Sequence, residues 1–146
     1  MNVLNEMKLN FPSKSSNESF ARVAVSAFIA ALDPTIDELA DIKTAVSEAV
    51  TNCIVHAYAD TIGTVYIHAK ILENRKISIR IRDNGCGIPD IKQAMEPMFT
   101  TCDTGERAGL GFAVMQSFMD KVKVYSKPFK GTSVVMEKTL TSKDEN

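Results

Sequence analysis

The segment ISIRIRDNGCGI, residues 77–88, places a glycine-rich turn directly after a strand-forming run. Isoleucines alternate with polar residues up to Ile81, which predicts a β-strand with one buried face. Asp83 ends the strand, and Gly85 and Gly87 allow positive φ angles and close approach of a ligand to the backbone. Two interpretations are open here: an ordinary Asn-Gly hairpin turn, or a ligand site in which Asp83 accepts a hydrogen bond from an exocyclic amine.

Helical and alternating patterns continue on both sides of this turn. Capping boxes at Ser15 with Glu18 and at Thr35 with Glu38 predict two helices, which end near residues 31 and 58. Further predictions are an edge strand over 7–11, a strand pair over 65–71 and 77–81, a short helix over 89–94, a mobile loop over 96–108, a helix from about 111, a closing strand pair over 122–124 and 134–136, and a polar tail over 141–146. Because helices and strands come in runs, the pattern predicts one α+β domain over residues 1–146, a two-layer sandwich.

The first helix is amphipathic in its sequence. Its predicted buried side consists of Phe20, Val23, Ala24, Ala27, Phe28 and Ala31. Ser19, Arg22 and Ser26 then lie on the outer side. Arg22 is the only basic residue between Lys14 and Lys43, and a planar guanidinium can anchor a protein interface.

Composition limits the class of protein. The 146 residues are 45% hydrophobic and 24% charged, and the longest apolar stretches are too short to cross a bilayer. The N-terminus does not resemble a signal peptide, and the three cysteines lack CxxC spacing, so we expect a cytoplasmic protein with reduced thiols. The net charge is −1, with basic and acidic residues interspersed. Without a stripe of Lys and Arg, we expect protein partners, no direct contact with nucleic acid and no membrane association.

Three further motifs could carry chemistry. Glu48, Asn52 and His56 recur every four residues on the second predicted helix and form one slowly spiralling polar stripe, although an exposed helix face would have the same pattern. Gly109 and Gly111 open a helix, where free N–H groups and the positive end of the helix dipole suit phosphate oxygens. Gly131-Thr132, before the last strand, fits an ordinary hairpin turn equally well. No single one of these motifs decides the function.

Their order, however, resembles the four conserved boxes of the superfamily that contains gyrase, Hsp90, histidine kinases and MutL-like ATPases. The resemblance spans roughly residues 40 to 136. Four longer runs are similar to the sporulation anti-sigma F factors and, more distantly, to the anti-sigma serine kinases of the general stress response. These runs are NESFARV (17–23), DELADIKTAVSEAVTNCIVHAY (37–58), DNGCGIPDIKQAMEPMFTT (83–101) and RAGLGFAVMQSFMDKV (107–122).

The resemblance implies a fold and an activity. The fold would be the histidine-kinase/gyrase/Hsp90 type of ATP-binding sandwich, with a mixed, mainly antiparallel sheet and helices on one face. The activity would be that of a serine/threonine-protein kinase that uses ATP and Mg²⁺. Its partners would be a sporulation sigma factor of the sigma F type, which it inhibits, and an anti-anti-sigma protein, which it phosphorylates. A homodimer is also implied.

The resemblance further implies roles for individual residues. Glu48 would be the catalytic base, Asn52 would coordinate Mg²⁺, and Asp83 would hold the adenine amine. The remaining nucleotide-binding positions would be Gly85, Gly87 and Thr132 around the base, Gly109 and Gly111 at the phosphates, and Thr100, Thr101 and Arg107 in an ATP lid at about 96–108. Arg22 would contact the partner proteins. Two departures are Cys86, between the paired glycines, and a phosphate loop with only one GLG.

Two alternatives to a serine kinase remain. A nucleotide-gated binding protein would use ATP to order its lid without transferring phosphate. A catalytic module of a histidine kinase or of a MutL-like ATPase would share the same motifs. Glu48 favours the kinase, because a switch that only binds partners needs no base one helical turn before the metal ligand.

Overall fold

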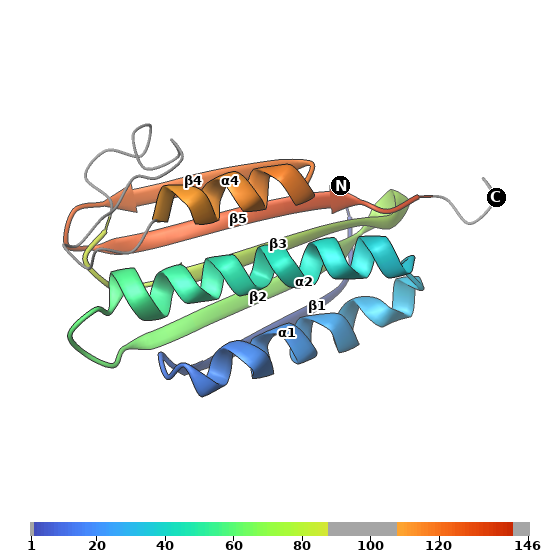
Figure 1. The fold of residues 1–146 in the computed structure, drawn as a ribbon. Coiled ribbons are helices and arrows are strands. Elements are labelled where there is room, and N and C mark those ends of the chain that lie inside the picture. Colours follow the sequence, from blue (N-terminus) through green and yellow to red (C-terminus); the bar gives the residue numbers. More distant parts are fainter. Residues whose placement is uncertain (1, 88–107, 142–146) are drawn as a thin grey trace.

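The computed structural model describes residues 2–87 and 108–141, and the side chains of 108–110 are not described. Five strands form one sheet in the order β1-β2-β3-β5-β4, and the helices lie on one of its faces (Figure 1). In chain order the elements are β1 Val3–Pro12, α1 Ser16–Ile29, η1 Ala30–Leu32, α2 Ile36–Thr51, η2 Asn52–Ala57, β2 Thr64–Leu72, η3 Glu73–Arg75, β3 Lys76–Asp83, α4 Ala108–Phe118, β4 Lys121–Lys127 and β5 Gly131–Thr139. The predicted two-layer α+β sandwich is confirmed.

The sheet follows the predicted strand pattern. Both predicted strand pairs are present, and β1 lies at the sheet edge as expected. All four strand pairings are antiparallel, so in the described residues the sheet is not mixed. The predicted short helix over 89–94 and most of the loop over 96–108 lie outside the described residues, as does the tail beyond Thr141.

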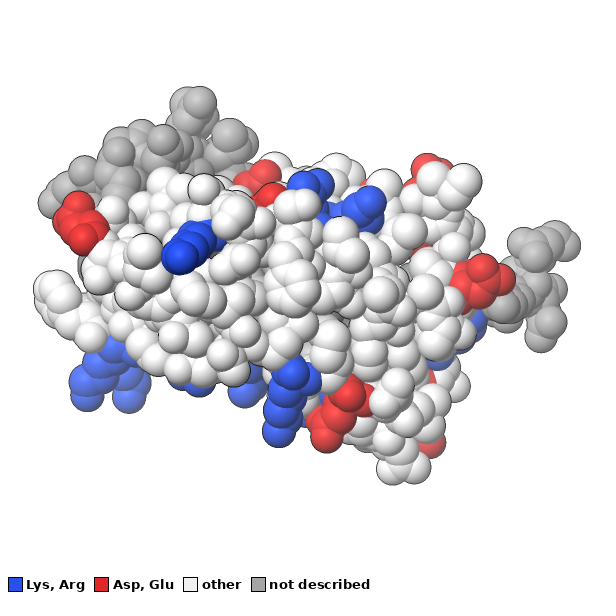
Figure 2. Space-filling model, turned by 90° about the horizontal axis from the view of Figure 1, so that it is seen from below, with Lys and Arg blue, Asp and Glu red and all other residues white. Residues whose placement is uncertain are grey.

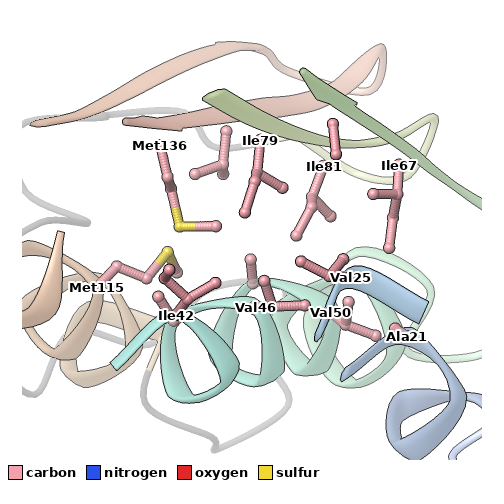
Figure 3. Close-up of a cluster of buried hydrophobic side chains, with 14 of the residues drawn as sticks. Ala21, Val25, Ile42, Val46, Val50, Ile67, Ile79, Ile81, Met115 and Met136 are labelled. Atoms are coloured by element: carbon pink, nitrogen blue, oxygen red, sulfur yellow. The ribbon is translucent and has the colours of Figure 1, made fainter. Parts of the chain in front are cut away.

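The core lies between the sheet and the helices. The alternating isoleucines of β2 and β3 point toward α2, and side chains such as Val46, Val50 and Met115 meet them from the helices (Figure 3). Ile67, Ile79 and Ile81 are each at most 1% exposed. This alternation fixes the register, because a shift of one residue would turn the whole buried set outward.

The buried face of α1 differs from the prediction. The residues that pack inward are Ala21, Val25 and Ile29, at a spacing of four, whereas Phe20 and Val23 are 52% and 63% exposed. The helix is therefore rotated relative to the sequence-based assignment. Phe28 still packs against the core as predicted, whereas Ala27 and Ala31, also assigned to the buried side, are exposed. The prediction failed because the sequence is apolar on most sides of this helix.

One of the two predicted capping boxes is confirmed. Thr35 accepts a hydrogen bond from the Glu38 N–H at 3.1 Å, and the Glu38 carboxylate accepts one from the Thr35 N–H at 2.9 Å. The box at Ser15 is wrong, since Ser15 has helical φ and ψ angles and its side chain makes no capping hydrogen bond. Glu18 instead bonds the hydroxyl of Ser47.

The second predicted helix changes its winding halfway through the polar stripe. Regular α-helix ends at Thr51, and η2 continues as a π-helix, in which the Tyr58 N–H donates to the Cys53 carbonyl at 3.0 Å. The wider turn was not predicted. Short π-helical segments occur frequently at functional sites, and this one begins at the predicted metal ligand Asn52.

The expectation of reduced thiols holds only in part. Cys53 is a free, buried cysteine. Cys86 is disulfide-bonded. The sequence could not indicate this, because an odd number of cysteines without CxxC spacing favours free thiols. Among the described residues, no helix is both long and apolar enough to cross a membrane.

The expectation that Lys and Arg form no stripe is wrong. Charges that are interspersed along the sequence become segregated in the sheet, because alternate residues of a strand point to opposite faces. Seen from the edge that carries β1 and α1, Lys and Arg side chains project in a row from the side away from the helices (Figure 2, lower rim).

Candidate functional site

Asp83 lies at the buried end of β3, where the strand meets the glycine-rich turn. It is only 5% exposed. Its Oδ1 accepts hydrogen bonds from the Gly85 N–H at 2.9 Å and the Thr132 N–H at 3.2 Å, and the Cys53 thiol also donates to the carboxylate. Burial raises the pKa of Asp83 above its usual value, and these hydrogen bonds partly offset the rise. The carboxylate is therefore held in one orientation by three donors.

The glycine-rich turn is fixed against the end of the second helix. The Tyr58 hydroxyl donates to the Thr64 carbonyl at 2.8 Å and accepts a hydrogen bond from the Asn84 N–H at 2.6 Å. At Gly85 a Cβ atom would lie 2.3 Å from the Ala57 carbonyl oxygen, so no larger residue fits. The turn is thus built for close backbone packing rather than as a plain hairpin. Sequence reasoning missed Tyr58 and Cys53, whose apolar context gave no signal of a polar role.

Glu48, Asn52 and Gly111 come together, as the motifs predicted. The hypothetical Cβ of Gly111 would lie 3.2 Å from both the Asn52 Oδ1 and the Glu48 Oε2. The first turn of α4 therefore lies directly against the two polar side chains of the second helix. A Cβ at this position would make a tight contact, so both side chains would have to shift by a few tenths of an ångström. The helix begins at Ala108, so Gly109 also lies in its first turn rather than before it.

One cavity connects the two groups of residues. It is lined by Ala49, Asn52, Cys53, His56, Ala57, Ile81, Asp83, Cys86, Gly87, Phe112, Thr132 and Val134. Asp83 lies in a largely apolar wall, which is the arrangement of a site for a flat aromatic base with one polar anchor. The cavity has a volume of about 30 Å³.

The residues at the Asn52 end fit a phosphate-bound metal ion. The Asn52 Nδ2 is buried and makes no hydrogen bond within the part of the chain that is described, although buried polar groups normally have a partner. Mg²⁺ binds oxygen ligands and is usually held by one or two protein groups together with substrate phosphates. Asn52 can supply one such oxygen beside the first turn of α4.

Glu48 is half-buried, and two effects disfavour its charged form. Burial raises its pKa above the usual value for glutamate, and the negative charge of Glu18 adds to the rise. Glu18 reaches this region from α1: its carboxylate bonds the hydroxyl of Ser47, the residue next to Glu48, and lies 3.1 Å from the Arg22 Nε. A carboxylate with a raised pKa is suited to accept a proton near neutral pH.

Arg22 lies apart from the nucleotide residues. Its side chain is 39% exposed, on the outer side of α1 as predicted, and pairs with Glu18 one helical turn away. Exposed Phe20 and Val23 lie on the same helix. The Glu18-Arg22 spacing of four was present in the sequence and could have predicted the pair. Thr100, Thr101 and Arg107 lie outside the described residues.

Comparisons with known proteins agree with this geometry. The chain matches the family model of the histidine kinase-like ATPase domain over residues 11–138. It is 61% identical to an anti-sigma F factor of Caldanaerobacter subterraneus subsp. tengcongensis over 93% of this chain and 94% of the relative. An anti-sigma F factor of Clostridium perfringens is 55% identical, over 94% of this chain and 99% of the relative.

Solved structures share the fold at low sequence identity. The RsbU and RsbW domains of a Mycobacterium tuberculosis protein align with a TM-score of 0.69 at 16% identity, covering 94% of this chain and 33% of that one. The catalytic domain of the histidine kinase ThkA aligns with a TM-score of 0.58 at 17% identity, covering 93% of this chain and 99% of that one. From the family match and the close relatives together, the chain belongs to the anti-sigma F factors, within the histidine kinase-like ATPase domain family.

Proposed function

We propose that this protein is an anti-sigma factor that binds and inhibits a sporulation sigma factor of the sigma F type. As an ATP-dependent serine kinase, it also phosphorylates and inactivates the anti-anti-sigma protein that antagonises it. The observation that carries the catalytic part is the placement of Glu48 one helical turn before Asn52, with both side chains against Gly111. The protein acts in the cytoplasm as a homodimer.

The residues of the site divide the chemistry between them. Asp83 accepts the adenine amine, with Gly85, Gly87 and Thr132 shaping the base pocket. Asn52 would hold Mg²⁺, and the ion would supply positive charge to stabilise the transferring phosphoryl group. Gly109 and Gly111 leave the N-terminal amides of α4 open to phosphate oxygens. Glu48 takes the proton from the attacking serine hydroxyl, and Thr100, Thr101 and Arg107 complete the nucleotide site from the lid.

The second candidate is a nucleotide-gated switch that binds the sigma factor without phosphotransfer. The position of Glu48 one helical turn before Asn52 argues against it, since a switch gains nothing from a half-buried carboxylate beside the metal ligand. Binding of sigma factor is tested by size-exclusion chromatography with and without Mg-ATP. The proposal expects a stable complex with ATP, and absence of any complex in either condition would refute the anti-sigma part.

Partner binding gives the first expected result. Arg22→Glu should weaken binding of both partner proteins by about tenfold or more, because interface arginines are frequent hot spots. The guanidinium would leave Glu18 for a partner carboxylate, with exposed Phe20 and Val23 providing apolar contact beside it. Lys43→Glu, with the same charge change on α2, is the control. Pull-downs at wild-type strength for Arg22→Glu would contradict the assignment, and ATP affinity should not change.

The second expected result concerns the Glu18 carboxylate. Glu18→Gln should move the acid limb of the phosphotransfer pH profile to lower pH. Removing the negative charge lowers the pKa of Glu48, so the base stays ionised at more acidic pH. The control is Glu73→Gln on the β2-β3 turn. A profile that keeps its position, or moves to higher pH, would show that Glu18 does not act on Glu48.

A further inference from the structure

The outer face of the sheet, on the side away from the helices, is strongly basic. We define this basic face by the outward side chains of the five strands. Its eight cations are Lys8, Lys70, Lys76, Arg80, Arg82, Lys121, Lys123 and Lys127, against two carboxylates, Glu6 and Glu137. The basic face therefore has a net charge of +6, whereas the whole chain has a formal net charge of −1. Figure 2 shows part of the basic face in profile.

Both carboxylates of the basic face are already paired. Glu6 lies 2.8 Å from the His68 Nε2, and Glu137 lies 3.1 Å from the Lys76 Nζ. Among the described residues, the other seven cations have no carboxylate within ion-pair distance. Such a field is costly to the fold by self-repulsion and attracts anions.

The basic face also carries flat side chains in one cross-strand row. Register places Tyr66 opposite Arg82, Arg82 opposite Ser133, and Ser133 opposite Tyr125. The Arg82 guanidinium stacks on the Tyr66 ring at 4.1 Å, and Tyr125 is 55% exposed. With neighbouring strands about 4.8 Å apart, the two tyrosines are separated by roughly 14 Å. The row therefore presents two separate planar surfaces at about the spacing of a few nucleotides.

A hollow of about 310 Å³ lies next to this row. It is lined by Lys8, Leu9, Asn10, Tyr66, Ile67, His68, Arg80 and Arg82. No carboxylate is among these residues, and most of their polar groups can donate hydrogen bonds to an anion.

We propose that the basic face binds single-stranded nucleic acid, with phosphates on the lysines and arginines and bases stacked on Tyr125 and on the Tyr66-Arg82 pair. Stacking on aromatic rings and guanidinium planes, beside a cationic track for the backbone, is how single strands are held without strong sequence preference. The basic face lies on the side of the sheet away from the helices, and a hollow of about 420 Å³ beside Arg82 and Tyr125 reaches Asp83 and Thr132, which also line the ATP cavity.

Other occupants fit less well. A second copy of the basic face would bring together two surfaces of the same sign. A protein partner needs an apolar centre in its interface, whereas the outward strand positions are mainly charged or hydroxylated. A lipid surface would meet the cations, but the exposed apolar side chains Leu4 and Phe129 lie at strand ends, and only the amphipathic Tyr125 is exposed within the cross-strand row.

The test uses the full chain and a fluorescein-labelled 12-nucleotide oligouridylate RNA, followed by fluorescence anisotropy at several salt concentrations. We expect binding that weakens with salt, with a slope of about −2 to −4 in log Kd⁻¹ against log[salt], as for three to six released phosphate charges at about −0.7 each. Arg80→Thr combined with Lys123→Thr should weaken binding at least tenfold, since threonine keeps the strand propensity while two cations are lost.

The control is Lys14→Thr combined with Lys43→Thr, which removes the same charge away from the sheet. Both double variants should keep the ATP affinity of the wild type, which shows that they fold. The proposal is overturned if the two double variants bind RNA equally, or if no binding is seen at 100 mM salt. It is also overturned if polyglutamate of equal charge, or phosphatidylglycerol vesicles, bind more tightly than the RNA.

Discussion

Glu48→Gln should lower the rate of phosphotransfer by about 10²- to 10⁴-fold, the usual contribution of a general base. Glutamine keeps the length and shape of the side chain but cannot accept the serine proton. Because Asn52 and the first turn of α4 are untouched, the affinity for Mg-ATP should stay within about threefold of the wild type. Single-turnover kinetics with γ-labelled ATP measure the rate, and calorimetry measures the affinity.

Two variants make this result specific. Asn52→Ala should reduce both phosphotransfer and Mg-ATP affinity, because it removes the proposed metal ligand. Glu73→Gln is the same chemical change at a surface turn and should alter neither. Wild-type phosphotransfer by Glu48→Gln would show that the base assignment is wrong, whereas a parallel loss of ATP affinity would move Glu48 from catalysis to binding.

Asp83→Asn should weaken adenine-nucleotide binding by about ten- to a hundredfold. A hydrogen bond to a charged group contributes about 1.5–3 kcal/mol, and the new amide can also present a donor to the adenine donor. The fold should survive, since the Asn oxygen can still accept from the N–H groups of Gly85 and Thr132. Burial raises the pKa of Asp83, so loss of its charge costs the folded state little.

Calorimetry with ATP and with GTP, together with thermal unfolding, checks this prediction. GTP carries no exocyclic amine at the position of the adenine amine, so the difference between the two nucleotides should shrink in Asp83→Asn. Asp37→Asn, on the exposed first turn of α2, is the matched control. Unchanged ATP affinity in a folded Asp83→Asn protein would rule out the adenine contact.

Much of the fold could be predicted because strands and caps depend on local signals. The alternating isoleucines of β3 and their partners in β2 specify both pairing and face. The Thr35-Glu38 box fixes the start of α2. The convergence of Asp83 with Thr132, and of Asn52 with Gly111, followed from the order of the motifs rather than from any one of them.

The predictions that failed concern features that depend on tertiary packing rather than on local sequence. On α1 the apolar residues surround most of the helix, so periodicity could not choose between Val23 and Val25 as the buried residue. The π-helix from Asn52 to Ala57 depends on tertiary packing against the glycine-rich turn, which leaves no local pattern. The basic face forms only when the strands pair, because pairing brings outward-facing residues that are distant in sequence onto one surface.

The central claim is that this site transfers phosphate to a serine of a partner protein. The most direct measurement is incubation of the protein with γ-labelled ATP, Mg²⁺ and a candidate anti-anti-sigma protein, followed by phosphosite mapping. The account expects acid-stable phosphoserine on the partner and none with Glu48→Gln. Acid-labile phosphohistidine, or ATP binding with no label on any protein, would contradict it.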